Sequence, residues 1–315
     1  MSAVVTVGTF DGVHRGHQAV LAEIVARARR RGAESVVVTF DPHPLAVVNP
    51  AAAPRLLTLP AERQRLLMAS GVDRVVTLPF TPELSRLGPE EFVRDVLRGQ
   101  VGMDELVLGH DHAFGRGRAG DVDVVRRIGI ADGFRVDVVD AVREDGQPIS
   151  STLIRAAVAH GDLALAARWL GRPYAALGDV TRGAGRGRTI GVPTINLPVP
   201  DGRKLLPPDG VYAVWVTVEG PGTGDPEGLP DGRGGRGRYG GMMNQGSRPT
   251  FGVAERGLEV HLFDFTGDLY GETVLVEWVR RLRDVQTFAS REALVDQLAR
   301  DAAAARETLE RVSVR

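Results

Sequence analysis

Two histidines three residues apart stand near the amino terminus, where a short apolar run gives way to a helical pattern. The stretch VVTVGTFDGVHRGHQAVL, residues 4–21, places His14 and His17 on either side of Gly16. A turn between a strand and a helix can present backbone N–H groups to an anion, and the helix start adds partial positive charge. Imidazoles there can donate hydrogen bonds to phosphate oxygens as charge builds on phosphorus in a transition state. The pattern indicates phosphate chemistry, but by itself it also fits two surface histidines. A metal site is disfavoured, because no third ligand of suitable spacing lies nearby in the sequence.

Two later stretches carry polar residues of the same kind. VLGHDHAFGRGRAGD, residues 107–121, follows a strand pattern and precedes a helical one. ISSTLIRAAV, residues 149–158, places Ser151, Thr152 and Arg155 at the start of a helix, where hydroxyls and a guanidinium suit phosphate. In a doubly wound sheet, ligands bind at the carboxyl ends of the strands, so these stretches are predicted to meet the histidines there.

The segment GRGRAG, residues 115–120, matches the glycine pattern of dinucleotide-binding proteins. However, the spacer HDHAF separates it from its strand, and the first strand–helix turn carries histidines instead. A nicotinamide dinucleotide is therefore not expected as a cofactor.

A second group of polar residues opens the carboxyl-terminal half, in DVTRGAGRGRTIGVPTINL, residues 179–197. Three glycines alternate there with small or basic residues: Gly183, Gly185 and Gly187, followed by Arg188. Such a loop can fold over phosphates, because backbone N–H groups and guanidinium both bind them. A surface turn is the alternative.

Strand-like segments after this loop carry further candidates. Thr194 and Asn196 lie two apart and share a face, and such an oxygen pair suits Mg²⁺ that also binds ATP phosphates. In LEVHLFDF, residues 258–265, Glu259 and His261 alternate with apolar residues. Glu259 is a base only if it can take a proton from a bound hydroxyl. Spacing alone also fits a polar outer strand face and a solvated carboxylate.

Alternating strand and helix patterns in the first half predict a parallel sheet covered by helices. The expected strands are nearly continuous β-branched runs, typical of burial on both faces: Val4–Val7, Ser35–Phe40, Arg74–Leu78, Glu105–Leu108 and Arg135–Val139. The expected helices are Gln18–Arg31, Ala61–Ser70, Pro89–Gly99, Asp121–Ala131, Ser151–His160 and Leu163–Leu170.

The second half instead shows strands and turns, which predict a small antiparallel barrel or sandwich. The expected strands are Gly210–Val218, Leu258–Phe265 and Thr273–Leu282. The Gly- and Pro-rich residues 219–241 are expected to form a flexible loop away from either site. From Ser290, the expected N-cap, an amphipathic helix ends the chain.

Length and charge bound the possibilities. The 315 residues suggest two domains, and a net charge of −1 argues against a broad nucleic-acid or membrane-surface partner. The absence of Cys excludes disulfides and thiolate zinc sites. The first residues lack the pattern of a signal peptide, and no apolar run is long enough to cross a membrane. A cytoplasmic protein without an obligate protein partner is expected.

GTFDGVHRGH, GHDHAFG and ISSTLIR, with the second half of the chain, resemble the prokaryotic bifunctional riboflavin kinase/FMN adenylyltransferase (FAD synthetase) family. The resemblance implies an FMN adenylyltransferase domain over residues 1–172, with a Rossmann-like nucleotidyltransferase fold. It also implies a riboflavin kinase domain over residues 173–315, a six-stranded antiparallel β-barrel ending in a helix. The implied reactions are phosphorylation of riboflavin to FMN and adenylyl transfer from ATP to FMN, giving FAD and pyrophosphate. Mg²⁺ with ATP is the implied cofactor, and the flavins are substrates and products.

The resemblance also implies roles for residues of the first site. The implied catalytic residues are His14, His17 and Arg155. The implied nucleotide-binding residues are Gly8, Phe10, Asp11, Gly12, Gly16, Asp111, Ser151 and Thr152. The sequence departs from the family beside Asp111, because many members have Phe and Arg where this chain has His112 and Ala113.

For the second site, the resemblance implies that Thr194 and Asn196 serve Mg²⁺–ATP and that Glu259 is the base for the ribityl 5′-hydroxyl. The glycine-rich loop is implied to bind nucleotide, through Gly183, Gly185, Gly187 and Arg188. Arg283 and Phe288 are implied to approach the flavin. Two other classes of function stay open at this point: a single-activity nucleotidyltransferase whose β-domain only binds, and a flavin-storage module without turnover.

Overall fold

The computed structural model describes residues 2–110, 114–183, 187, 190–219, 237–248 and 253–313. It divides into two compact units, Met1–Ile154 and Arg155–Arg315. The division falls within helix α7 (Ser151–His160), whereas the boundary predicted from the sequence follows residue 172.

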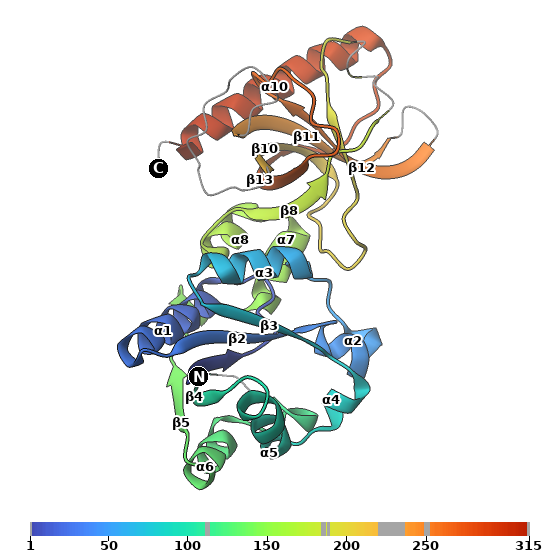
Figure 1. The fold of residues 1–315 in the computed structure, drawn as a ribbon. Helices are drawn as coiled ribbons and strands as arrows, with labels where there is room; N and C mark the ends of the chain where they lie inside the picture. Colours follow the sequence, from blue (N-terminus) through green and yellow to red (C-terminus); the bar gives the residue numbers. More distant parts are fainter. Residues whose placement is uncertain are drawn as a thin grey trace. The chain divides into compact units, whose positions relative to one another are not determined.

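The first unit is built on a five-stranded parallel sheet with the order β3-β2-β1-β4-β5, and this confirms the predicted α/β fold (Figure 1). All five predicted strands are present: β1 (Ala3–Val7), β2 (Glu34–Asp41), β3 (Arg74–Pro79), β4 (Met103–Gly109) and β5 (Arg135–Val139). The principal helices are α1 (Arg15–Arg31), α3 (Pro60–Ala69), α6 (Val122–Asp132) and α7. Shorter elements are α2 (Pro44–Val48), η1 (Pro50–Ala52), α4 (Pro82–Arg86), α5 (Pro89–Glu91), η3 (Arg116–Arg118), β6 (Arg143–Glu144) and β7 (Gln147–Pro148).

Helices cover both faces of this sheet because its central strands are apolar on both sides. Val4 of β1 packs with Leu21 and Ile24 of α1, whereas Val5 packs on the other face with Leu97. Leu97 belongs to a π-helix over Phe92–Arg98, which continues α5 in the place of the α-helix expected there.

The second unit is a six-stranded antiparallel sheet with the order β8-β13-β10-β11-β12-β9. Its elements are α8 (Leu163–Leu170), β8 (Tyr174–Asp179), β9 (Ile195–Pro198), β10 (Gly210–Glu219), β11 (Arg238–Arg248), β12 (Val253–Leu262), β13 (Thr273–Arg283) and α10 (Arg291–Ser313). Beyond the end of β8, the Thr181 N–H donates to the Asn196 carbonyl at 2.8 Å. This bridge joins the two edge strands and closes the sheet into a barrel.

Two expectations for the second unit need correction. The loop predicted over residues 219–241 is shorter, because Glu219 ends β10 and Arg238–Gly241 begin β11; residues 220–236 lie outside the described part of the chain. The strand expected over Leu258–Phe265 begins at Val253 and ends at Leu262.

The terminal helix begins as predicted. The Ser290 hydroxyl accepts the Ala293 N–H at 3.1 Å, so Ser290 is the N-cap of α10. Ala305 and Leu309 of α10 pack on Met242 and Phe263 of the barrel. No helix in the described ranges is both long and apolar enough to cross a membrane.

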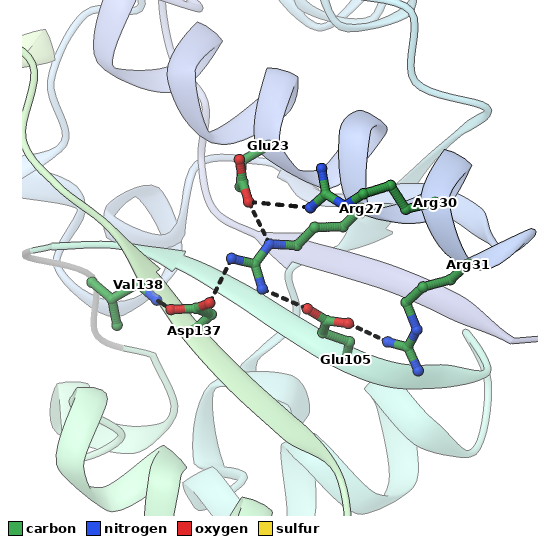
Figure 2. Close-up of polar contacts among 7 residues, drawn as sticks. All are labelled: Glu23, Arg27, Arg30, Arg31, Glu105, Asp137 and Val138. Carbon is green, nitrogen blue, oxygen red and sulfur yellow. Dashed lines mark hydrogen bonds and ion pairs between the residues drawn. The ribbon is translucent and has the colours of Figure 1, made fainter.

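A network of charged side chains fastens α1 to β4 and β5 (Figure 2). Arg27 donates to Glu105 at 2.7 Å and pairs with Glu23 at 2.6 Å and with Asp137 at 2.5 Å. Glu105 also pairs with Arg31, and its side chain is only 3% exposed. Burial opposes the charge of Arg27, but its hydrogen bonds to the three carboxylates outweigh burial and raise the pKa of the guanidinium. The network fixes the carboxyl-terminal part of α1, whose N-cap is His14 and whose first turn includes His17.

Replacing Glu105 by Gln removes the charge that Arg27 and Arg31 share while keeping the side-chain shape. We expect the free energy of unfolding of the first unit to fall by about 3 kcal/mol, because two cations then lose a buried partner. Urea unfolding of the whole chain, with hydrogen exchange of the β1 and β4 amides, measures this change. Glu23→Gln is the matched control: its side chain is 35% exposed, and it should cost less than about 1 kcal/mol. Equal losses in the two variants would contradict this account of the network.

Candidate active sites

The loop between β1 and α1 adopts an unusual backbone conformation. Phe10, Gly12 and Val13 have φ values of 47°, 83° and 40°. These values lie in the left-handed region of backbone conformation, which residues other than glycine rarely adopt. At the start of the loop, the Gly8 N–H donates to the Val38 carbonyl of β2 at 3.0 Å. The loop lies at the carboxyl end of β1, where the sequence predicts the ligand.

Asp11 fastens this loop to the segment before α3. The side chain is fully buried, and its carboxylate accepts the N–H groups of Leu57 and Thr58 at 3.0 and 2.9 Å. The Thr58 hydroxyl donates to the same carboxylate at 3.1 Å and accepts the Gly12 N–H at 2.9 Å. Asp11, predicted as a nucleotide-binding residue, thus holds the loop through its side chain.

The two histidines lie against each other at the start of α1. His14 is the N-cap residue, and its Nδ1 accepts the His17 N–H at 3.3 Å. The two imidazoles stack with ring centroids 3.6 Å apart, and Phe10 contacts His17 edge-on at 5.1 Å. A Cβ on Gly16 would lie 3.1 Å from the His14 ring, so the glycine allows the helix backbone to pass close to the imidazole. The intervening Arg15 forms an ion pair with Glu144.

The start of α7 joins the same loop. The Ser150 hydroxyl accepts the Leu153 N–H at 3.3 Å, and the Ser151 hydroxyl donates to the Asp11 carbonyl at 2.9 Å. The structure therefore brings Ser151 to the histidine loop, with Thr152 beside it and exposed. Arg155 follows one turn later on the same helix and belongs to the second compact unit. Asp111, His112 and Ala113 lie outside the described residues.

The GRGRAG segment is accounted for by packing. A Cβ on Gly115 would lie 3.0 Å from the Pro89 nitrogen, and one on Gly120 would lie 2.9 Å from the Pro89 Cβ. Both glycines therefore allow this turn to pass close to the first residue of α5.

In the second unit, the glycine-rich loop lies against the Thr–Asn pair. A Cβ on Gly183 would overlap the amide atoms of Asn196, and one on Gly187 would lie 3.3 Å from the Thr194 Oγ1. Gly187 also accepts two backbone hydrogen bonds, from Ile190 and Val192. Gly185 and Arg188 lie outside the described residues.

Strand register aligns polar residues across three neighbouring strands of the barrel. Asn196 of β9 lies opposite Glu259 of β12, and Glu259 lies opposite Asn244 of β11. Residues directly opposite each other share a face, so the three side chains form one row. The row brings Glu259 and Asn196 together, which the separate motifs do not reveal. Asn244 is absent from the residues predicted for the site, and its cross-strand position becomes visible only with the register.

His261 is a further residue to which the sequence motifs give no role. Its Nδ1 lies 2.7 Å from the carbonyl oxygen of Pro193, the residue before Thr194. The alternating pattern of residues 258–265 places His261 on the Glu259 face, and this is the signal that the sequence offers.

Arg283, the last residue of β13, and Phe288, which precedes α10, are predicted to approach a flavin and lie near each other. The Arg283 guanidinium lies 5.7 Å from the Phe288 ring centroid. It also donates to both carboxylate oxygens of the buried Asp301, at 2.7–3.0 Å, and to the Asp284 carbonyl at 2.8 Å. These contacts fasten β13 to α10.

The two halves of the chain match two families of known proteins. The family model described as FAD synthetase matches residues 1–153, and the one described as riboflavin kinase matches residues 170–309. The bifunctional riboflavin kinase/FMN adenylyltransferase of Pseudomonas fluorescens is 40% identical over 304 residues, which cover 96% of this chain and 92% of that protein. The chain belongs to this bifunctional family. The enzyme of the same name from Escherichia coli (strain K12) is 39% identical, with the same coverage.

A solved structure shares the fold over nearly the whole chain. A Streptococcus pneumoniae structure titled macrolide-efflux protein is 34% identical, with a TM-score of 0.80. The matched region covers 95% of this chain and 92% of the other chain. The predicted family, its activities and their order along the chain are thus confirmed, with the FAD synthetase part first and the riboflavin kinase part second.

Gly183→Ala tests the close contact in the riboflavin kinase unit. Its Cβ would overlap the Asn196 amide, so the loop or the amide must shift, and we expect riboflavin kinase activity to fall at least about tenfold. FMN formed from riboflavin and ATP measures the effect, and FAD formation from supplied FMN should not change. Gly202→Ala is the matched control, because a Cβ there would have no atom within 4 Å. A Gly183→Ala chain as active as Gly202→Ala would contradict the assignment.

Proposed function

We propose that the second unit transfers phosphate from ATP to riboflavin and that the first unit joins the resulting FMN to AMP from a second ATP. The observation that carries this proposal is that the histidine loop, with Ser151 and Thr152, and the group of Thr194, Asn196 and Glu259 lie in different compact units, each within its own family match. FMN is the product of one site and the substrate of the other.

For the adenylyl transfer, we assign the phosphate contacts to the β1–α1 loop and the start of α1. An FMN phosphate oxygen attacks the α-phosphorus of ATP, and the bond from that phosphorus to the β-phosphate oxygen breaks, releasing pyrophosphate. His14 and His17 donate hydrogen bonds to the oxygens on which charge increases. The loop backbone at Gly8, Phe10, Gly12 and Gly16 contacts the nucleotide, whose tail is held by Ser151, Thr152 and Arg155. Asp11 contributes indirectly, because it holds the β1–α1 loop in place. Asp111 contacts the nucleotide, as the sequence predicts.

For the phosphorylation, we assign Glu259 as the general base. Its carboxylate takes the proton of the ribityl 5′-hydroxyl as the oxygen attacks the γ-phosphorus, and ADP leaves. Its place in the row with Asn196 supports this role, because that row lies beside the glycine-rich loop. Gly183, Gly185, Gly187 and Arg188 then cover the ATP phosphates.

Thr194 and Asn196 fit a magnesium ion. Both supply hard oxygen donors, a hydroxyl and an amide carbonyl, and both lie close to the backbone of a glycine, Gly187 or Gly183. Mg²⁺ bound there would offset the charge of the ATP phosphates. The two residues orient the nucleotide, and Glu259 moves the proton.

Several expectations stay predictions. They are the flavin contacts of Arg283 and Phe288, the domain boundary after residue 172, the cytoplasmic location, and the lack of nucleic-acid, membrane and obligate protein partners.

His17→Ala tests the first site. Losing one preorganised donor should lower the rate of FAD formation about 10²–10³-fold, while riboflavin kinase activity continues and FMN accumulates. Chromatographic separation of FMN and FAD, made from riboflavin, ATP and Mg²⁺, measures both activities at once. His160→Ala, at the end of α7, is the matched control and should leave both unchanged. Loss of both activities in a folded His17→Ala chain would refute the separation of the sites.

Glu259→Ala tests the second site, because it should abolish the activity that His17→Ala leaves intact. Removing the proposed base should lower FMN formation about 10²–10⁴-fold, whereas supplied FMN is still converted to FAD at the normal rate. The same chromatographic assay applies, with the exposed Glu310→Ala as control. If Glu259→Ala phosphorylated riboflavin normally, another residue would have to be the base. A flavin-storage module would retain flavin without ATP turnover in every variant.

A further inference from the structure

Thr58 lies at the centre of a buried hydrogen-bond cluster beneath the histidine loop. Its side chain is almost fully buried, and its hydroxyl donates one hydrogen bond and accepts another. It donates to the Asp11 carboxylate at 3.1 Å and accepts the Gly12 N–H at 2.9 Å. A single hydroxyl thus connects the side chain of one loop residue with the backbone of the next.

The segment that carries Thr58 is itself firmly held. Leu56 and Leu57 are buried on its amino-terminal side. On the other side, Leu59 donates its N–H to the Glu62 carboxylate at 2.8 Å at the start of α3. The buried Arg63 of α3 donates to the Phe40 carbonyl of β2 at 2.8 Å. Thr58 is therefore attached to the sheet and can serve as a fixed point for the loop.

The loop needs such a fixed point because its backbone is strained. Phe10 and Val13 have positive φ, a conformation that is unfavourable for residues other than glycine. Strained conformations persist only where the surroundings overdetermine them. Hydrogen bonds that join Asp11 and Gly12 to Leu57 and Thr58 oppose relaxation of the loop centre.

We propose that Thr58 is a positioning residue for adenylyl transfer: by fixing Asp11 and Gly12 it holds His14 and the first turn of α1 at the phosphates. This inference rests on the proposed FMN adenylylation. Thr58 contacts the loop and not the reacting atoms. Its effect should therefore appear in the rate of the bound complex, because a shift of about 1 Å in a catalytic group can lower a rate about 10²-fold.

Thr58→Val tests the proposal, since valine has the same shape but neither donates nor accepts. We expect kcat for FAD formation from FMN and ATP to fall about 10- to 100-fold, with KM for both substrates within about threefold of the wild type. The assay uses the full chain at a temperature where the variant is folded. A merely structural role would lower the melting temperature and leave kcat per folded molecule unchanged, and that result would overturn the proposal.

The matched variants separate the hydroxyl from packing. Thr58→Ser keeps the hydroxyl and should restore kcat to within about threefold of the wild type. Thr308→Val makes the same change at a buried threonine of α10 and should alter neither activity. If Thr58→Val does not fold, Thr58→Cys replaces it, because a thiol fills the space but is a weak hydrogen-bonding group. Wild-type kcat in folded Thr58→Cys, or a large loss in Thr58→Ser, would overturn the proposal.

The kinase activity of the same chain is the internal control and should stay within about twofold of the wild type in every Thr58 variant. Equal loss of both activities would also overturn the proposal. If the wild-type chain made no FAD from FMN, the proposed function itself would fail. If it made FAD and Thr58→Val were equally fast, only the role of Thr58 would fail.

Discussion

Close approach of the backbone to a polar side chain is the constraint on which both candidate sites depend. In the first unit, Gly16 lets the helix pass within contact of the His14 imidazole. In the second, Gly183 and Gly187 lie against Asn196 and Thr194. A Cβ at any of these glycines would press against the neighbouring polar side chain. Each unit meets this constraint on a rigid sheet: the loop after β1 is fastened to the segment before α3, and the barrel is closed beside Asn196.

Much of the fold is predictable because its pattern is local. The five parallel strands are short β-branched runs, and Ser290 caps the terminal helix as its side-chain chemistry predicts. The sequence does not predict strand β11, because Gly240 and Gly241 near its start are typical of a loop. A Cβ on Gly240 would lie 2.9 Å from Leu309 of α10, and one on Gly241 would lie 2.7 Å from the His261 carbonyl oxygen. Contacts with distant segments therefore explain why glycine stands in this strand. A local sequence pattern does not reveal such contacts.

The residue types of the sites are predictable for the same reason, but their mutual arrangement is not. The motifs mark the His14–His17 pair, and the structure adds that the two rings stack. Glu259 and Asn196 are separated by 63 positions in the sequence, and only the strand register places them opposite each other. Thr58 carries no recognisable signal, because a threonine before a helix is ordinary. Its importance arises from folding, which brings it to a loop 46 residues earlier in the chain.

If the two sites act independently, FMN made at one site can reach the other site of a second molecule through solution. The most direct measurement mixes two variants, one with His17→Ala and one with Glu259→Ala, and follows FAD formation from riboflavin, ATP and Mg²⁺. Each variant alone should make almost no FAD. The mixture should produce FAD after a lag, because FMN released by the first variant reaches the intact adenylyltransferase of the second. A mixture that stays inactive, although both proteins are folded and each retains its other activity, would contradict the account.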